Sequence, residues 1–159
     1  MGTSSDRHRL RNRLLSLFPD EDNTGFTPLD LVHKFGSPLM ALLYSELFWP
    51  HFREVEGMVF LADRIEDSED EAEVAATLDK LGSRTEVEKR FNFVAVPELF
   101  GRMARQSTDE EDEWLATRLQ EMWSARLGQC YPSRCFEVRV APATEDGDEI
   151  GILFFERHN

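Results

Sequence analysis

The sequence predicts an α+β fold in which several helices pack against a small, mostly antiparallel sheet that includes a C-terminal β-hairpin. Apolar residues recur at helical spacing in several segments and alternate with polar residues near the end of the chain. Helical segments followed by strands, without regular alternation of the two, favour this class over a parallel sheet. The 159 residues, 41% of them hydrophobic, suffice for one domain with a packed core.

Residues 1–18 predict a basic N-terminal helix or arm, and residues 19–159 a single acidic α+β domain. Leu10, Leu14 and Leu17 recur at helical spacing, and four arginines lie between them and before them. The turn-rich stretch from Pro19 to Pro28 is the expected linker.

Two helices that begin at proline follow this linker. Thr27-Pro28 and Ser37-Pro38 are start signals, because proline tolerates the first helical position, where its missing N–H has no partner to lose. The segment Leu39–Phe48 is the most apolar helix in the chain, and we expect it to lie at the centre of the core.

The middle of the chain predicts a hairpin over residues 52–61 with Gly57 at its turn. A helix from about Glu69 to Leu81, with Gly82 as its C-cap, comes next. Residues 84–90 are ambiguous, and the apolar residues of 91–96 favour a strand, although helix remains open for the first part.

The clearest element is a helix from about Asp109 to Leu127. Thr108 caps it, Glu111 lies at capping-box spacing from Thr108, and Gly128 is expected to stop it. Residues 136–140 then alternate between apolar and polar, a turn surrounds Gly147, and residues 150–155 form the second strand of the hairpin.

Charge and cysteine content indicate a cytoplasmic protein. Acidic residues outnumber basic ones by 31 to 18, and the formal net charge of −13 argues against direct binding of nucleic acid, since phosphates would be repelled. No apolar run approaches the roughly 20 residues of a membrane-spanning helix, and the arginine-rich start lacks a leader's apolar core. We expect Cys130 and Cys135 to be free thiols in a reducing compartment.

No catalytic or cofactor motif is present, so we predict a protein that is not an enzyme and that carries neither a cofactor nor a metal. Phosphate loops, dinucleotide fingerprints, nucleophile elbows and calcium-binding loops are all missing. The four histidines are scattered, and Cys130 and Cys135 have no second Cys/His pair nearby to complete a zinc site.

The acidic clusters at residues 63–73 and 109–113 have two interpretations. They keep the protein soluble and favour helix starts, or they form a negative surface that docks a basic protein partner, for example a toxin or nuclease. In composition and layout the chain resembles small acidic bacterial proteins of the immunity or antitoxin kind, and no motif assigns a role to a particular residue. The residues predicted to contact the partner are Glu69, Asp70, Glu71, Asp109, Glu110, Glu111, Asp112, Glu113, Trp114 and Trp49.

Two alternatives stay open. One is an enzyme or small-ligand protein with a site assembled from Glu46, His51 and Glu88, because a carboxylate late in an apolar helix would titrate abnormally if buried. The other is an adaptor or subunit that pairs through the edge of its C-terminal hairpin, or a homodimer.

Overall fold

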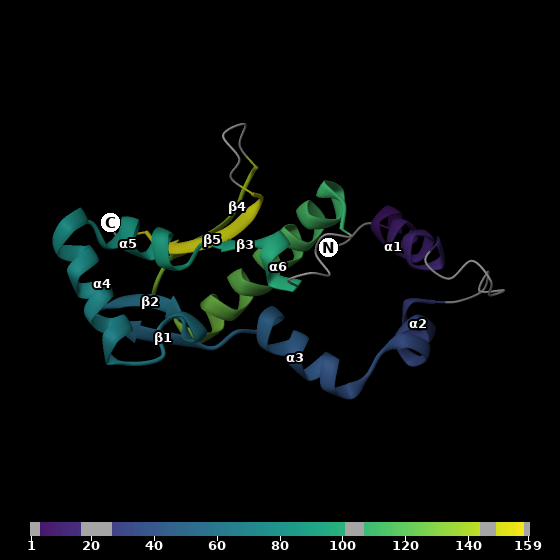
Figure 1. The fold of residues 1–159 in the computed structure, drawn as a ribbon, viewed down its shortest axis with the longest axis horizontal. Helices are drawn as coiled ribbons and strands as arrows, with labels where there is room; N and C mark the ends of the chain where they lie inside the picture. The colour runs from purple at the N-terminus through teal and green to yellow at the C-terminus, as the bar shows by residue number, and fades with distance from the viewer. Residues whose placement is uncertain (1–3, 17–26, 101–106, 144–148, 158–159) are drawn as a thin grey trace. The chain divides into compact units, whose positions relative to one another are not determined.

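The computed structural model describes residues 4–16, 27–100, 107–143 and 149–157, and it confirms the α+β class with its C-terminal hairpin (Figure 1). Residues 1–44 and residues 45–159 form two compact units. Most of the linker predicted at Pro19–Pro28, and the turn predicted around Gly147, lie outside the described residues.

Residues 1–44 hold α1 (Ser4–Ser16), α2 (Pro28–Phe35) and most of α3 (Pro38–Phe48). Both predicted start signals are confirmed. Thr27 caps α2: its hydroxyl accepts from the Asp30 N–H at 3.3 Å, and its own N–H donates to the Asp30 carboxylate at 2.8 Å. These hydrogen bonds from Thr27 lower the pKa of Asp30. Ser37 caps α3 by accepting from the Met40 N–H at 3.2 Å.

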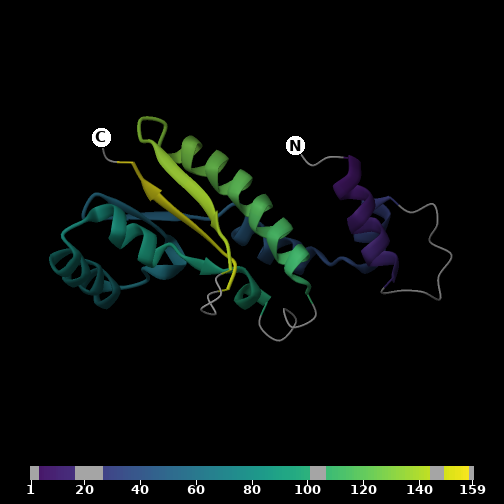
Figure 2. The same ribbon diagram turned by 90° about the horizontal axis from the view of Figure 1, so that it is seen from above.

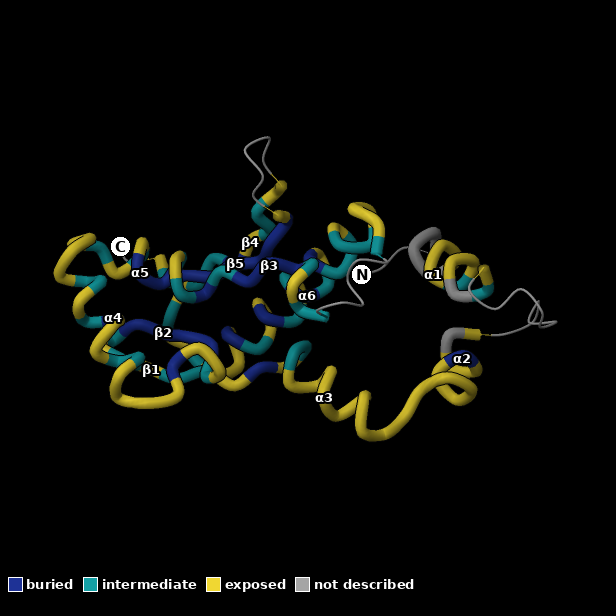
Figure 3. Tube along the Cα trace, in the orientation of Figure 1, coloured by how far each residue is buried: buried dark blue, intermediate teal, exposed yellow. Residues whose placement is uncertain are grey.

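The expectation that α3 lies at the centre of the core is wrong. None of its residues is buried, and in Figure 3 most of the helix is coloured as exposed. Only Leu47 and Phe48, in the last turn, pack against a buried cluster of residues 45–159. That cluster is filled by strands and by the long helix instead.

The predicted hairpin consists of β1 (Phe52–Val55) and β2 (Met58–Leu61). Glu56 and Gly57 form the two-residue turn with φ of 53° and 76°, the left-handed geometry that matches the twist of a hairpin. β2 is buried on both faces because alternate side chains enter different cores. Met58 and Phe60 pack in one cluster with Val74 and Val87, whereas Val59 and Leu61 pack toward the long helix.

After a short 3-10 turn, η1 (Ala62–Arg64), come α4 (Ser68–Leu81) and α5 (Arg84–Phe91). Gly82 ends α4 with a φ of 64°, as predicted. The ambiguous segment is helical as far as Phe91, because Ser83 caps it by accepting from the Glu86 N–H. The strand expected there shrinks to the two residues of β3 (Val94–Ala95).

The second sheet has the order β3–β5–β4 and is antiparallel throughout, with β4 spanning Phe136–Ala141 and β5 spanning Gly151–Glu156. The long helix α6 (Asp109–Cys130) packs along β4 and β5. Trp123 of α6 meets Phe154 of β5 edge to face, with ring centroids 6.1 Å apart. This pair lies in the largest core cluster, which joins α6 to both sheets.

Gly128 does not stop α6, contrary to the sequence prediction. The helix continues to Cys130, and the Tyr131 N–H donates to the Leu127 carbonyl at 2.8 Å. A glycine ends a helix when it takes a left-handed conformation, and Gly128 keeps a negative φ. The helix ends one residue before Tyr131, where the following Pro132 disfavours helical geometry in the residue before it.

Two glycines of this unit respond oppositely to an added methyl group. We expect Gly151→Ala to lower the free energy of unfolding by about 1–3 kcal/mol, because a Cβ there overlaps the Phe93 ring and lies 2.9 Å from the Val94 carbonyl oxygen. We expect Gly128→Ala to raise it by up to about 1 kcal/mol, because its Cβ meets nothing and alanine favours helix. Urea unfolding of both variants checks the pair, and equal shifts would contradict the packing around Gly151.

Candidate functional site

The first turn of α6 carries carboxylates that serve two purposes. Glu111 closes a capping box with Thr108: its carboxylate accepts from the Thr108 N–H at 2.8 Å, and its N–H donates to the Thr108 hydroxyl at 3.3 Å. The carboxylates of Asp109, Asp112 and Glu113 have no hydrogen-bond or ion-pair partner among the residues that the structure describes. Within the described residues, these three carboxylates are therefore not engaged in holding the fold.

In the first turn of α4, most carboxylates form hydrogen bonds or ion pairs within the protein. Asp67 and Asp70 form a capping box, in which the Asp70 carboxylate also accepts from the Glu66 N–H at 2.7 Å. Glu71 pairs with the guanidinium of Arg53 on β1. Of the three predicted contact residues here, Glu69 alone keeps a carboxylate without a partner in the described part of the chain.

The two clusters lie apart in the unit formed by residues 45–159. α4 lies at the left end of the ribbon and α6 begins toward the right in both views (Figures 1 and 2). Asp109, Glu110 and Glu113 at the start of α6 are exposed, as is Glu69 on α4. They therefore form two separate acidic surfaces.

The two predicted aromatic anchors differ in their availability. Trp49 is 40% exposed, and the guanidinium of Arg126 on α6 lies 5.6 Å from its ring. Arg126 is itself held by the Pro50 carbonyl at 3.3 Å. Trp114 is half-buried, and its buried indole N–H has no acceptor among the described residues. Trp49 thus offers a ring to a partner more openly than Trp114 does.

The residues of the alternative enzymatic site divide between surface and interior. His51 Nε2 lies 3.6 Å from Glu46 Oε2, in a pair whose side chains are 70% and 61% exposed. Glu88 is fully buried. The structure brings the first two together at the surface, where water screens them.

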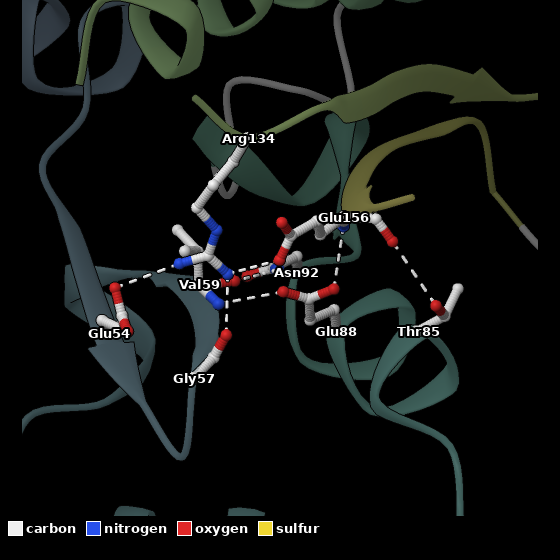
Figure 4. Close-up of polar contacts among 8 residues, drawn as sticks. All are labelled: Glu54, Gly57, Val59, Thr85, Glu88, Asn92, Arg134 and Glu156. Atoms are coloured by element: carbon white, nitrogen blue, oxygen red, sulfur yellow. Dashed lines mark hydrogen bonds and ion pairs between the residues drawn. The ribbon is translucent and has the colours of Figure 1, made fainter. Parts of the chain in front are cut away.

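Glu88 of α5 ties together strands from both sheets (Figure 4). Its Oε1 accepts from the Val59 N–H of β2 at 2.9 Å, and its Oε2 accepts from the Glu156 N–H of β5 at 2.8 Å. A buried carboxylate needs such donors, because leaving it unpaired would cost several kcal/mol. This carboxylate is therefore engaged in holding the fold.

Asn92, at the end of α5, extends the same bridge. Its Nδ2 donates to the carbonyls of Val59 at 2.8 Å and Phe154 at 3.3 Å, and its Oδ1 accepts from the Leu61 N–H at 3.2 Å. It is fully buried, one helical turn beyond Glu88. The two side chains supply hydrogen bonds that a strand between β2 and β5 would otherwise provide.

Arg134, in the turn before β4, forms a second tie between the sheets (Figure 4). It donates to the Glu54 carboxylate at 3.0 Å, the Gly57 carbonyl at 2.7 Å and the Glu156 carboxylate at 2.5 Å. The hydrogen bond to Glu156 raises the pKa of Arg134 above its ordinary value. The guanidinium thus joins the turn of the first hairpin to the end of β5.

An open groove of about 250 Å³ lies beside this network, lined by Arg64, Glu73, Arg90, Phe91 and Phe93. Pockets that enclose a drug-sized ligand usually exceed about 300 Å³. The groove has room for one small group at the surface and does not enclose a substrate.

Within the described ranges, no set of three or more His, Cys, Asp or Glu side chains is placed to hold a metal ion. Cys130 and Cys135 are exposed free thiols. In the same ranges no helix is both long and apolar enough to cross a bilayer. Comparison with protein-family models, with curated proteins and with solved structures finds no match to this chain.

Sequence reasoning did not identify Asn92 and Arg134. One signal for Asn92 was present: it follows Glu88 at i+4, the spacing at which two polar side chains share one face of a helix. Arg134 follows Tyr131-Pro132 in a turn, and its partners lie more than 20 residues away in sequence, at distances that no local pattern encodes.

The bridging role of Glu88 predicts a large loss of stability on truncation. Glu88→Ala leaves the buried Val59 N–H and the part-buried Glu156 N–H without this acceptor, and we expect the free energy of unfolding to fall by about 2–5 kcal/mol. Glu86→Ala, on the exposed side of the same helix, should lower it by less than about 1 kcal/mol. Urea unfolding compares the two. A Glu88→Ala variant as stable as the wild type would contradict the structural role of this carboxylate.

The Arg134 tie is tested against a matched surface pair. Arg134 and Glu156 keep only 18% and 15% of their side-chain surface exposed, so Arg134→Ala should lower the free energy of unfolding by about 2–4 kcal/mol. Arg157 pairs with Glu137 at 2.9 Å with its side chain 60% exposed, so Arg157→Ala should change it by less than about 1 kcal/mol. Thermal and urea unfolding measure both, and similar losses would show that the buried position of Arg134 contributes nothing special.

Proposed function

We propose that this protein is a non-enzymatic, cytoplasmic binding protein that docks a basic protein partner, in the manner of an inhibitor or immunity protein. The start of α6 receives the partner, and Trp49 anchors it. The observation that carries the proposal is the set of three carboxylates on Asp109, Asp112 and Glu113, which have no partner in the described part of the chain.

The electrostatics of the chain support this assignment. The formal net charge of −13 attracts a cationic protein from a distance, and the carboxylates of Asp109, Asp112 and Glu113, which have no partner among the described residues, give that attraction a direction. Such steering raises association rates by about 10- to 1000-fold at low ionic strength. Glu111 is held in the capping box, so the geometry of this turn is fixed before a partner arrives.

Trp49 supports slow dissociation after the encounter. Arg126 holds its ring in place, so little side-chain freedom remains to be lost on binding. Asp112 and Arg126 lie about four turns apart on α6, a distance of about 20 Å. An interface of standard size, about 800 Å² on each partner and about 30 Å across, reaches from one to the other.

The compartment and the absence of catalysis are part of the proposal. Two exposed free thiols suit a reducing cytoplasm. The buried carboxylate of Glu88 is fully used by the backbone of β2 and β5, and Glu46 and His51 lie in water. Neither environment prepares a general acid or base for catalysis.

The test begins by isolating the protein that co-purifies with this chain from its native cell at low salt, and then measures association by stopped flow. We expect Asp109→Asn/Asp112→Asn/Glu113→Gln to slow association about tenfold at low salt, with no change at high salt. The reason is that these carboxylates lead the encounter, and salt screens their field.

A second triple variant provides the control. Asp63→Asn/Glu73→Gln/Asp79→Asn also takes the net charge from −13 to −10, at exposed positions on and before α4. It should leave the association rate within about twofold of the wild type. Equal slowing by both variants would assign the effect to total charge and contradict a site on α6. An association rate independent of salt would contradict the proposed function itself.

A further inference from the structure

The open groove of about 250 Å³ is lined by five side chains of three chemical kinds. Arg64 ends η1, and Glu73 lies on α4. Arg90 and Phe91 are the last residues of α5, and Phe93 lies between α5 and β3. Two guanidiniums, one carboxylate and two phenyl rings therefore meet around one small space, all within the unit formed by residues 45–159.

The two guanidiniums of the groove, on Arg64 and Arg90, are exposed and have no hydrogen-bond or ion-pair partner among the described residues. Glu86 lies four residues before Arg90, at the spacing of a helical ion pair, and binds Lys89 at 2.6 Å instead. A guanidinium fork fits a carboxylate, which it binds through two parallel hydrogen bonds. The groove thus presents two such forks that the described part of the fold does not use.

Glu73 determines which anion suits the groove. Its carboxylate is exposed and likewise has no partner in the described part of the chain. A phosphate monoester, with its two negative charges, would be repelled by this carboxylate. A ligand that carries an ammonium group next to a single carboxylate uses all three charged side chains.

Phe91 and Phe93 supply the apolar wall of the groove, and the fold holds both rings in place. Phe91 meets Phe60 edge to face, with ring centroids 5.8 Å apart. The Phe93 ring lies against Gly151, where an added Cβ would overlap it. Since these rings are fixed before a ligand arrives, an aromatic side chain packs against them at little cost in entropy.

We propose that this groove is a binding site for a free amino acid with an aromatic side chain. The carboxylate of the ligand binds Arg64 and Arg90, and its ammonium group binds Glu73. Its ring packs against Phe91 and Phe93. A free amino acid carries these three groups on one carbon atom, whereas a residue at either end of a peptide has lost one of the two charges.

The test is a titration of the full chain with L-phenylalanine, followed by the backbone amide signals in nuclear magnetic resonance. We expect saturable shifts at the groove residues with a Kd on the order of 1 mM, because an open groove leaves part of the ligand in water. Three analogues each lack one group: 3-phenylpropionate the ammonium, phenylalanine amide the carboxylate, and alanine the ring. Each should bind about tenfold more weakly or worse.

Variants of the charged side chains assign each contact. Arg64→Gln/Arg90→Gln should weaken L-phenylalanine binding about tenfold or more and abolish its preference over phenylalanine amide. Glu73→Gln should abolish its preference over 3-phenylpropionate. Lys80→Gln/Arg84→Gln, the control, also removes two positive charges, at positions on α4 and α5 outside the groove, and should leave the Kd within about twofold. All five positions are exposed, so the dispersion of the amide spectrum should stay unchanged.

Three results would overturn the proposal. One is the absence of saturable shifts at the groove with L-phenylalanine. Equal binding of 3-phenylpropionate would identify a simple anion site and exclude recognition of an amino acid. Equal weakening by Lys80→Gln/Arg84→Gln would assign the effect to total charge. The basic partner takes no part in these titrations, so their failure leaves the proposed function unaffected.

Discussion

Two side chains of one short helix join the two sheets, and the arrangement of residues 45–159 depends on them. β2 and β5 do not pair with each other; Glu88 and Asn92 hydrogen-bond to the backbone of both. This explains why β3 has only two residues: beyond it, α5 satisfies the edge of β5 where a strand would otherwise continue. It also explains why a carboxylate is tolerated at full burial, since each oxygen receives an N–H and replaces the water it has lost.

Arg134, in the turn between α6 and β4, holds the same two sheets together a second time. Because it leaves the turn that directly follows α6, its hold on Gly57, Glu54 and Glu156 also fixes where α6 ends. The Trp123 indole donates to the Leu47 carbonyl at 2.9 Å and fixes the helix again about two turns before its end. The acidic first turn is therefore presented by a helix whose far half is anchored at several points, and a rigid scaffold of this kind lets fixed charges act together on an approaching partner.

Local chemistry made most elements predictable, and long-range packing decided the rest. Capping boxes and proline start signals act within four residues, so the starts of α2, α3 and α6 follow from the sequence alone. The apolar composition of α3 correctly indicated a helix, but composition does not say whether the surface it covers belongs to the same molecule. Residues 84–91 were ambiguous because their polar side chains include Glu88, whose buried partners lie about 30 and 70 residues away in sequence. Of the candidate site, the sequence supplied the acidic residues and Trp49, whereas only the structure distinguishes carboxylates held in caps from those that have no partner among the described residues.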